Sequence, residues 1–247
     1  DAWSNASRLS ALRQPVRQPV AQRRILPILA RTAAVIAVVG AAAIFAAQYS
    51  GSPKSQTYAT GLGGRETLAL SDGSRIELNT NTVLRVATNA RDRTVWLDKG
   101  EAYFEIKHDA THPSVVFTTG HRITDLGTKF LVRQNEDGVE VALMEGKARF
   151  DSDNSAQAHS AILRPGEVAI ATADSVSVTH TATTKLANEL SWRQGQLIFT
   201  ETTLGDAAAE FNRYNTTKLV VTDPTIARIK INGTFTTDGA EMFARSA

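Results

Sequence analysis

The chain has 247 residues, of which 42% are hydrophobic and 21% are charged. This balance is typical of globular proteins and excludes a wholly disordered chain. The absence of cysteine excludes disulfides, thiolate metal sites and a cysteine nucleophile. The net charge of +2 is unevenly distributed, because residues 1–31 carry a balance of +5 and the rest carries −3. The body of the chain therefore offers no basic field for nucleic acid.

An apolar stretch near the N-terminus predicts one transmembrane helix over residues 25–49. Its main part, Thr32–Tyr49, is uncharged, and residues 25–30 extend it past Arg31. About 20 helical residues span the hydrocarbon core of a bilayer, so the length is sufficient. The arginines upstream place residues 1–24 in the cytoplasm, as a tail left from a larger domain, and the remaining residues across the membrane. A cleaved signal peptide and a twin-arginine export signal are the alternatives.

Short strand signals separated by turn residues run from residue 57 to residue 181 and predict a mainly β domain. A sandwich, a roll and a solenoid all fit this pattern. Residues 51–64 are rich in Gly, Ser and Thr and predict a linker, while Asp72–Gly73 predicts a type I′ hairpin. Lys99–Gly100 predicts a turn between two separate strands. The expected strands are 67–70, 74–79, 83–86, 94–98, 101–106, 115–118, 121–125, 128–133, 139–143, 147–150, 161–163, 167–171 and 175–180.

Residues 185–247 predict a small α+β module that ends before a full core closes, as a C-terminally truncated module would. Thr203 and Asp206 form a pair resembling a capping box, followed by apolar residues at helical spacing up to Phe211, and Asn215 is a plausible end for the helix. Strands are expected over 196–200, 219–222 and 229–235. A second helix is expected to begin in 238–247.

A search for catalytic motifs finds no constellation of a turnover enzyme and no phosphate loop. His108 and His112 precede Pro113, which favours a turn with solvated imidazoles over a metal site on a helix. Trp96 and Trp192 are expected in a core or a domain junction rather than in a sugar platform. We therefore expect no metal, no cofactor and no multiple-turnover enzyme, and a hydrolase is the least favoured class.

The pair Gly127–Thr128 has a chemistry of its own. A Thr hydroxyl after Gly can attack the preceding carbonyl carbon when the backbone is strained, which moves the acyl group from nitrogen to oxygen. Water then cleaves the resulting ester. Gly permits the distorted approach because it has no Cβ. A tight turn that opens a strand explains the same pair, and spacing alone favours the turn.

Four motifs in this order resemble those of the FecR family. They are the hairpin Leu70–Asn79, the run Lys99–Asp109 with sequence KGEAYFEIKHD, the segment Leu126–Phe130 with sequence LGTKF, and Val141–Gly146 with sequence VALMEG. The apolar segment upstream fits the family layout. The module downstream resembles the short domain at the N-termini of secretins and outer-membrane receptors.

The resemblance implies a single-pass inner-membrane sensor with a cytoplasmic N-terminus and a periplasmic body. Such a protein relays a signal from the signalling domain of a TonB-dependent outer-membrane receptor to an extracytoplasmic-function sigma factor, often for iron–siderophore or other nutrient uptake. Some members self-cleave at a Gly-Thr pair, which Gly127 and Thr128 match. The cytoplasmic sigma-binding domain is largely missing from this sequence, where only residues 1–24 could belong to it.

The signalling hypothesis predicts a surface for a protein partner. An exposed strand of the C-terminal module could accept a partner strand, and ordinary internal strands are the alternative explanation of both candidate segments. A membrane-anchored module that binds glycan or cell-wall components is the second hypothesis for the whole chain. The candidate partner-binding residues are Lys218, Leu219, Val220, Val221, Lys230 and Ile231.

Overall fold

The computed structural model describes residues 55–88, 93–109, 111–125, 127–152, 159–172 and 175–246. The predicted transmembrane helix at 25–49 and the tail at 1–24 lie outside these residues. None of the helices in the described ranges combines the length and the apolar character that crossing a bilayer requires.

The predicted mainly β architecture is confirmed, and its centre is a strand of 13 residues, β5 (Arg93–Glu105). The N-terminal half of β5 pairs with β4 and, in parallel, with β6, whereas its C-terminal half pairs with β3 and β8. The turn predicted at Lys99–Gly100 is therefore wrong: the chain bends there but does not reverse. Both halves of the strand have hydrogen-bonding neighbours on either side, and these keep it extended.

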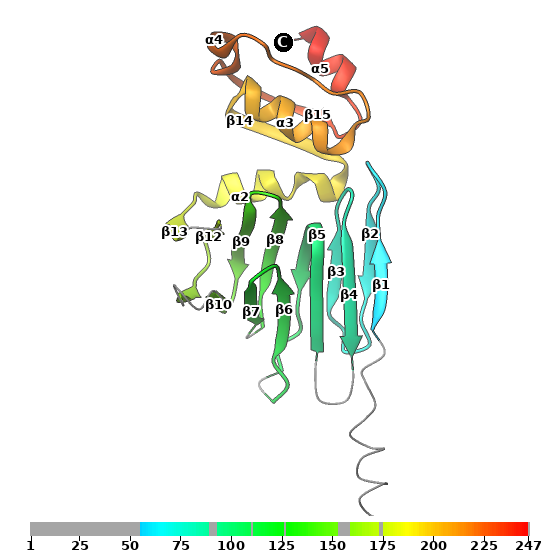
Figure 1. Ribbon diagram of the computed structural model, residues 1–247, viewed down its shortest axis with the longest axis vertical. Coiled ribbons are helices and arrows are strands. Elements are labelled where there is room, and N and C mark those ends of the chain that lie inside the picture. Colours follow the sequence, from blue (N-terminus) through cyan, green and yellow to red (C-terminus); the bar gives the residue numbers. More distant parts are fainter. Residues whose placement is uncertain are drawn as a thin grey trace, which may run out of the picture. The chain divides into compact units, whose positions relative to one another are not determined.

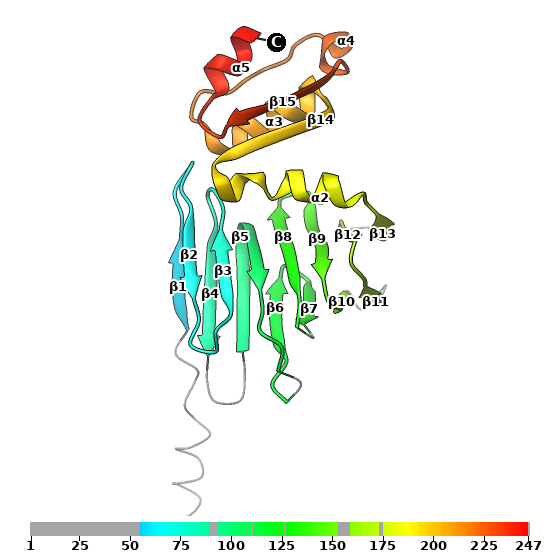
Figure 2. The ribbon, with the colours of Figure 1, turned by 180° about the vertical axis from the view of Figure 1, so that it is seen from behind.

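Two curved halves of one sheet meet along β5 (Figures 1 and 2). The first half also contains β1 (Gln56–Ala59), β4 (Val83–Thr88), β6 (Ser114–Thr118), β7 (His121–Asp125), β10 (Ala148–Ser152) and β11 (Ser160–Leu163). The second half also contains β2 (Glu66–Ala69), β3 (Arg75–Leu78), β8 (Lys129–Asn135), β9 (Gly138–Glu145), β12 (Glu167–Ala171) and β13 (Val176–His180). Among the described residues, every strand pair of this sheet except β5–β6 is antiparallel.

Two further local predictions in this domain need correction. The expected linker contains β1, which pairs with β4 and packs Tyr58 against the core. Its short polar sequence shows no alternation that would have indicated a strand. The β2–β3 connection is a turn, as predicted, but not of type I′. It spans residues 70–74, and only Gly73 among them has a positive φ, whereas type I′ requires two such residues.

The alternation of side chains along the second half of the sheet produces two cores. Phe104 and Phe130 point between the two halves, where their rings stack with centroids 4.8 Å apart. Their neighbours Tyr103 and Leu131 point to the opposite face and join a second core with Trp192. Successive side chains of a strand lie on opposite faces, so one strand can serve both cores.

The second core belongs to the predicted α+β module. Figures 1 and 2 show α2 between the strands β8 and β9 on one side and the remainder of the module on the other. The elements of the module are α2 (Thr183–Glu189), the 3-10 helix η1 (Ser191–Gln194), β14 (Gln196–Thr203), α3 (Leu204–Tyr214), α4 (Pro224–Ala227), β15 (Lys230–Thr236) and α5 (Ala240–Ser246). The strands β14 and β15 form an antiparallel pair.

Helix α3 confirms the sequence prediction at both ends. The Thr203 hydroxyl accepts a hydrogen bond from the Asp206 N–H at 3.1 Å, as an N-cap does, and Asn215 ends the helix in an extended conformation. The expected strand at 219–222 is wrong, because these residues form neither a strand nor a helix. The helices α2, η1 and α4 were not predicted from the sequence. Helix α2 has no side chain that caps its N-terminus, so its sequence carried little signal.

The stacked pair in the first core gives a stability prediction. Replacing Phe130 by Ala leaves a cavity against Phe104, and we expect a loss of about 3–5 kcal/mol in the free energy of unfolding. Denaturant unfolding of the purified chain measures it. Val220→Ala, at a side chain that is 77% exposed, is the control and should change little. Equal losses in the two variants would contradict the assignment of Phe130 to the core.

Candidate functional site

The four sequence motifs meet around one surface hollow of about 450 Å³. Far apart in the chain, they converge because β3 and β8 flank the C-terminal half of β5, and β9 pairs with β8. The lining residues are Gly73, Arg75, Glu105, Ile106, Lys107, His108, Gly127, Thr128, Lys129 and Glu145. Gly127 and Thr128 therefore line a hollow to which each of the four motifs contributes at least one residue.

The backbone at Gly127 adopts a conformation that favours glycine. Its φ is +95°, and a Cβ at this position would lie 2.6 Å from both Cβ and Nδ1 of His108. The Gly127 N–H donates a hydrogen bond of 3.1 Å to Oδ1 of Asp125, which holds the turn. A side chain at Gly127 would thus be opposed both by the backbone angle and by His108.

Thr128 is 3% exposed and directly precedes β8. Its Oγ1 donates a hydrogen bond to the same Oδ1 of Asp125, which is itself 2% exposed. The Thr128 carbonyl accepts a bond of 3.0 Å from the Ile106 N–H, which fixes the chain after the pair. The hydroxyl is consequently held in contact with a buried carboxyl group.

A second glycine packs against this pair. A Cβ on Gly146 would lie 2.3 Å from the carbonyl oxygen of Gly127 and 2.8 Å from Cγ2 of Thr128. The turn after β9 therefore approaches the Gly127 carbonyl more closely than any other residue type would allow. This contact explains the glycine in the fourth motif.

Two other motif residues, Asn79 and Glu101, join the β domain to the module. Glu101 is fully buried, and its Oε2 accepts hydrogen bonds from Arg133 Nε at 2.5 Å and from Arg213 Nη2 at 2.7 Å. Its Oε1 accepts a bond of 2.9 Å from Nδ2 of Asn79, which also bonds the hydroxyl of Tyr214. Burial by itself raises the pKa of Glu101, but the charges of the two arginines outweigh it and hold the pKa below its usual range.

Further contacts across this junction come from η1. Arg193 makes a two-pronged ion pair with Glu77, with distances of 2.6 and 2.9 Å, and its guanidinium lies 3.9 Å from the ring centroid of Tyr103. Arg65 donates a bond of 2.7 Å to the carbonyl of Trp192. Charged, aromatic and backbone groups thus all tie the module to the sheet.

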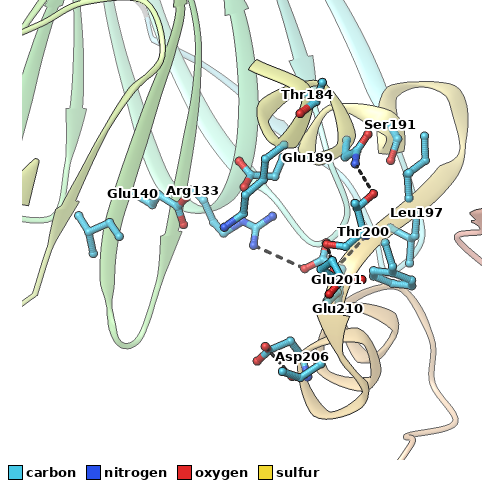
Figure 3. Close-up of a pocket in the computed structure, with 17 residues that line it drawn as sticks. Arg133, Glu140, Thr184, Glu189, Ser191, Leu197, Thr200, Glu201, Asp206 and Glu210 are labelled. Carbon is cyan, nitrogen blue, oxygen red and sulfur yellow. Dashed lines mark hydrogen bonds and ion pairs between the residues drawn. The ribbon is translucent and has the colours of Figure 1, made fainter. Parts of the chain in front are cut away.

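A cavity of about 690 Å³ lies between α2, β14, α3 and the strands β8 and β9 (Figure 3). In this cavity Arg133 Nη1 donates a hydrogen bond of 3.5 Å to Oε2 of Glu210 in α3. Glu189 of α2 lies near Arg133 (Figure 3). Burial, and next the negative charge of Glu140, raise the pKa of Glu189 to about 7. Its buried Oε2 has no hydrogen-bond partner within the described ranges.

The candidate partner-binding residues divide into two groups. Residues 218–221 form no strand, because Asn212 bonds the N–H and the carbonyl of Leu219 at 2.7 and 2.8 Å and keeps the segment beside α3. Lys230 and Ile231 lie in β15, which pairs with β14. Val220 is 77% exposed, while Leu219 and Val221 pack against the second core. Their role in binding a partner stays a prediction.

The tryptophans and histidines considered in the sequence lie in different surroundings. Trp192 is buried in the second core, as expected for a junction residue. The same expectation for Trp96 is wrong, because this side chain is only partly buried and stacks on Phe117 with ring centroids 6.0 Å apart. His112 bonds Asp109 in an exposed turn, and His108 lies beside Gly127. No cluster of three or more metal-binding side chains occurs in the described ranges.

Neither Asp125, the last residue of an expected strand, nor Glu101 was predicted from the sequence to be a functional residue. The signal for Asp125 was its position three residues before Thr128 in a turn, a spacing at which a carboxylate can reach the hydroxyl. Nothing in the sequence around Glu101 indicated a buried charge, since its partners lie 22 to 112 residues away.

Comparison with solved structures shows that the fold occurs in other proteins. The chain resembles two crystal structures of a candidate anti-sigma factor from Parabacteroides distasonis ATCC 8503, each with a TM-score of 0.62 and 24% identity. The matches cover 78% and 77% of this chain and 89% of those chains, which shows a shared fold. No curated protein gives a significant match.

The family comparison is more specific. Residues 56–149 match the family described as FecR protein. This range holds all four motifs and the Gly127–Thr128 pair, so the chain carries a FecR-family domain. The resemblance predicted from the motifs is confirmed.

The raised pKa of Glu189 gives a prediction about pH. The folded value of about 7 exceeds the ordinary value of 4.5, so the folded protein binds more protons than the unfolded chain between these values. Glu189 therefore lowers stability as pH rises through this window. We expect Glu189→Gln to raise the melting temperature above about pH 7 and to change it little below about pH 4.5.

Thermal melts of the parent and the variant at both ends of the window measure this effect. Glu136→Gln, in the exposed turn between β8 and β9, is the matched control and should leave the pH dependence unchanged. A Glu189→Gln variant with the same pH dependence as the parent would show that Glu189 is ionised normally in the folded protein.

Proposed function

We propose that the chain is the envelope part of a sensor that regulates an extracytoplasmic-function sigma factor. The FecR-family domain at residues 56–149 supports this role, and the fold shared with a candidate anti-sigma factor is consistent with it. In this proposal residues 25–49 cross the inner membrane, the tail lies in the cytoplasm and the described domains lie in the periplasm. The apolar run and the arginines before it support this orientation.

The signal in this proposal comes from the signalling domain of a TonB-dependent outer-membrane receptor, loaded with an iron–siderophore complex or another nutrient. The module is the part that would meet the receptor, since β14 and β15 form a sheet of only two strands within the described residues. A two-stranded sheet leaves edges that a partner strand can extend. No cofactor is needed, because the signal passes as a population shift or as exposure of a cleavage site.

Self-cleavage between Gly127 and Thr128 is the second part of the proposal. The observation that supports it is the Thr128 hydroxyl, buried against the carboxyl group of Asp125 directly after a glycine with a positive φ. A nucleophile with a hydrogen-bonded base beside it is the arrangement that acyl transfer requires. The event is a single turnover that splits the chain once, so the protein is not an enzyme in the usual sense.

The alternative function is a membrane-anchored module that binds glycan or cell-wall components. One observation favours it: the rings of Trp96 and Phe117 stack on the outer face of the first half-sheet and are both partly exposed. The guanidinium of Arg85 lies over Trp96, 5.2 Å from its ring centroid, and reduces the free ring surface. We therefore rank this function second.

The mass of the purified chain tests self-cleavage. We expect two fragments that meet at Gly127 and Thr128, because the hydroxyl can attack the carbonyl before it. Thr128→Ala removes the nucleophile and should give one uncut chain. An uncut parent after prolonged incubation would contradict the proposal, and fragments from both proteins would point to a contaminating protease.

Transcript profiling tests the regulatory role. In cells that lack the natural protein, we expect altered transcription of genes controlled by one extracytoplasmic-function sigma factor. Re-expression of the protein should restore the pattern. Unchanged transcription, together with retention of the chain on a glycan matrix, would favour the alternative function.

A further inference from the structure

Asp125 is the buried group that accepts a hydrogen bond from the Thr128 hydroxyl. Its backbone is held on both sides, because β7 pairs with β6 and β10 and places Asp125 opposite Ser114 and Ala148. Its Oδ1 accepts hydrogen bonds from the Gly127 N–H and from Thr128 Oγ1. A carboxylate fixed in this way keeps one oxygen on the hydroxyl proton.

We propose that Asp125 is the catalytic base of cleavage between Gly127 and Thr128, an inference that rests on the self-cleavage proposed above. A threonine hydroxyl loses its proton only to a base within hydrogen-bonding reach. Asp125 meets this requirement in the folded chain before any rearrangement. It touches the reacting oxygen and is therefore a catalytic residue rather than a positioning one.

The first step moves the acyl group from nitrogen to oxygen. The Asp125 carboxylate takes the proton from Thr128 Oγ1 as this oxygen bonds to the carbonyl carbon of Gly127, whose π electrons move to the carbonyl oxygen. The C–N bond then breaks, and the nitrogen of Thr128 takes the proton back from Asp125. The products are an ester between Gly127 and Thr128 Oγ1, a free amine on Thr128 and a regenerated carboxylate.

The second step uses one water molecule. Water adds to the ester carbon, the bond from this carbon to Thr128 Oγ1 breaks, and Oγ1 recovers a proton from the water. The second proton of the water passes from the new carboxylic acid of Gly127 to the free amine of Thr128. One chain then ends at the carboxylate of Gly127, and a new chain begins at the ammonium group of Thr128. The hollow beside Gly127 opens to solvent and supplies the water, and no oxidant, metal or cofactor enters either step.

Titratable groups other than Asp125 line the hollow beside Gly127 and Thr128, and His108 is the main competitor for the role of base. Its ring lies beside Gly127, whereas Asp125 bonds the Thr128 hydroxyl itself. Lys129 Nζ forms an ion pair of 2.7 Å with Oε2 of Glu145. The titratable residues that line the hollow are Arg75, Glu105, Lys107, His108, Lys129 and Glu145.

The test compares cleavage rates of the full chain and its variants by mass spectrometry. Asp125→Asn keeps an oxygen that can accept from the Gly127 N–H but removes the base, and we expect cleavage to slow about 100-fold or more. Asp98→Asn is the matched control, because Asp98 is an exposed partner of Arg85 away from the hollow. His108→Gln tests the competitor. Both of these variants should cleave at the rate of the parent.

Two readouts distinguish a base from a merely structural residue. The residual cleavage of Asp125→Asn depends on hydroxide and should rise about tenfold per pH unit, whereas the parent rate stays level over the same neutral range. Hydroxylamine cleaves esters, so it should accelerate release of fragments from the parent more than from Asp125→Asn. If Asp125→Asn has a lower melting temperature than the parent, the variant Asp125→Glu distinguishes loss of the base from loss of stability, because it keeps the carboxylate. We expect Asp125→Glu to cleave at least about tenfold faster than Asp125→Asn.

The outcomes separate this inference from the proposed function. Cleavage of Asp125→Asn at the parent rate, or equal rates for Asp125→Asn and Asp125→Glu, would overturn the role of Asp125 and leave self-cleavage standing. Loss of cleavage in His108→Gln alone would assign the base to His108. A parent that stays intact like Thr128→Ala would overturn self-cleavage and this inference together.

Discussion

The fold depends on the way β5 takes part in both halves of the sheet. Its N-terminal half carries Val95 and Leu97 into the first core, and its C-terminal half carries Ala102 and Phe104 into the same core. Alternation then turns Tyr103 toward the second core. The strand is hydrogen-bonded along both edges, and residues 101–104 are buried on both faces. It has little freedom to shift its register, because a slip of one residue would exchange the two faces. The remaining strands are placed relative to this one.

The same strand explains why a charge is buried at the junction. Glu101 follows the bend in β5, and its carboxylate lies between Arg133 of β8 and Arg213 of α3. Removing one partner of a buried ion pair leaves an uncompensated charge, which costs far more than an exposed pair contributes. Arg193 and Glu77 add a less buried pair at the same junction. The module is thus tied to the β domain by groups that are satisfied only when both parts are folded.

The hollow around Gly127 follows from the same pairing. Because β8 lies against β5, the end of the second motif approaches the third, and the turn after β9 brings Gly146 against the Gly127 carbonyl. Strand pairing therefore explains why the four motifs meet around the hollow that contains the proposed cleavage site. Asp125 reaches Thr128 through a short turn, but β6 and β10 hold its backbone in place. Local and distant constraints act on the same carboxylate.

The sequence by itself determined the features that short-range physics controls. Period-two alternation located most strands, Thr203 and Asn215 marked the ends of α3, and four motifs identified the FecR-family domain. Only the tertiary structure decided the features that depend on distant partners. Lys99–Gly100 resembles a turn in the sequence, because the sequence does not show the neighbouring strands that keep β5 extended. Residues 219–222 resemble a strand, but Asn212 holds this segment beside α3. The pairing of Glu101 and the grouping of His108, Gly127 and Gly146 arise from contacts that no local pattern encodes.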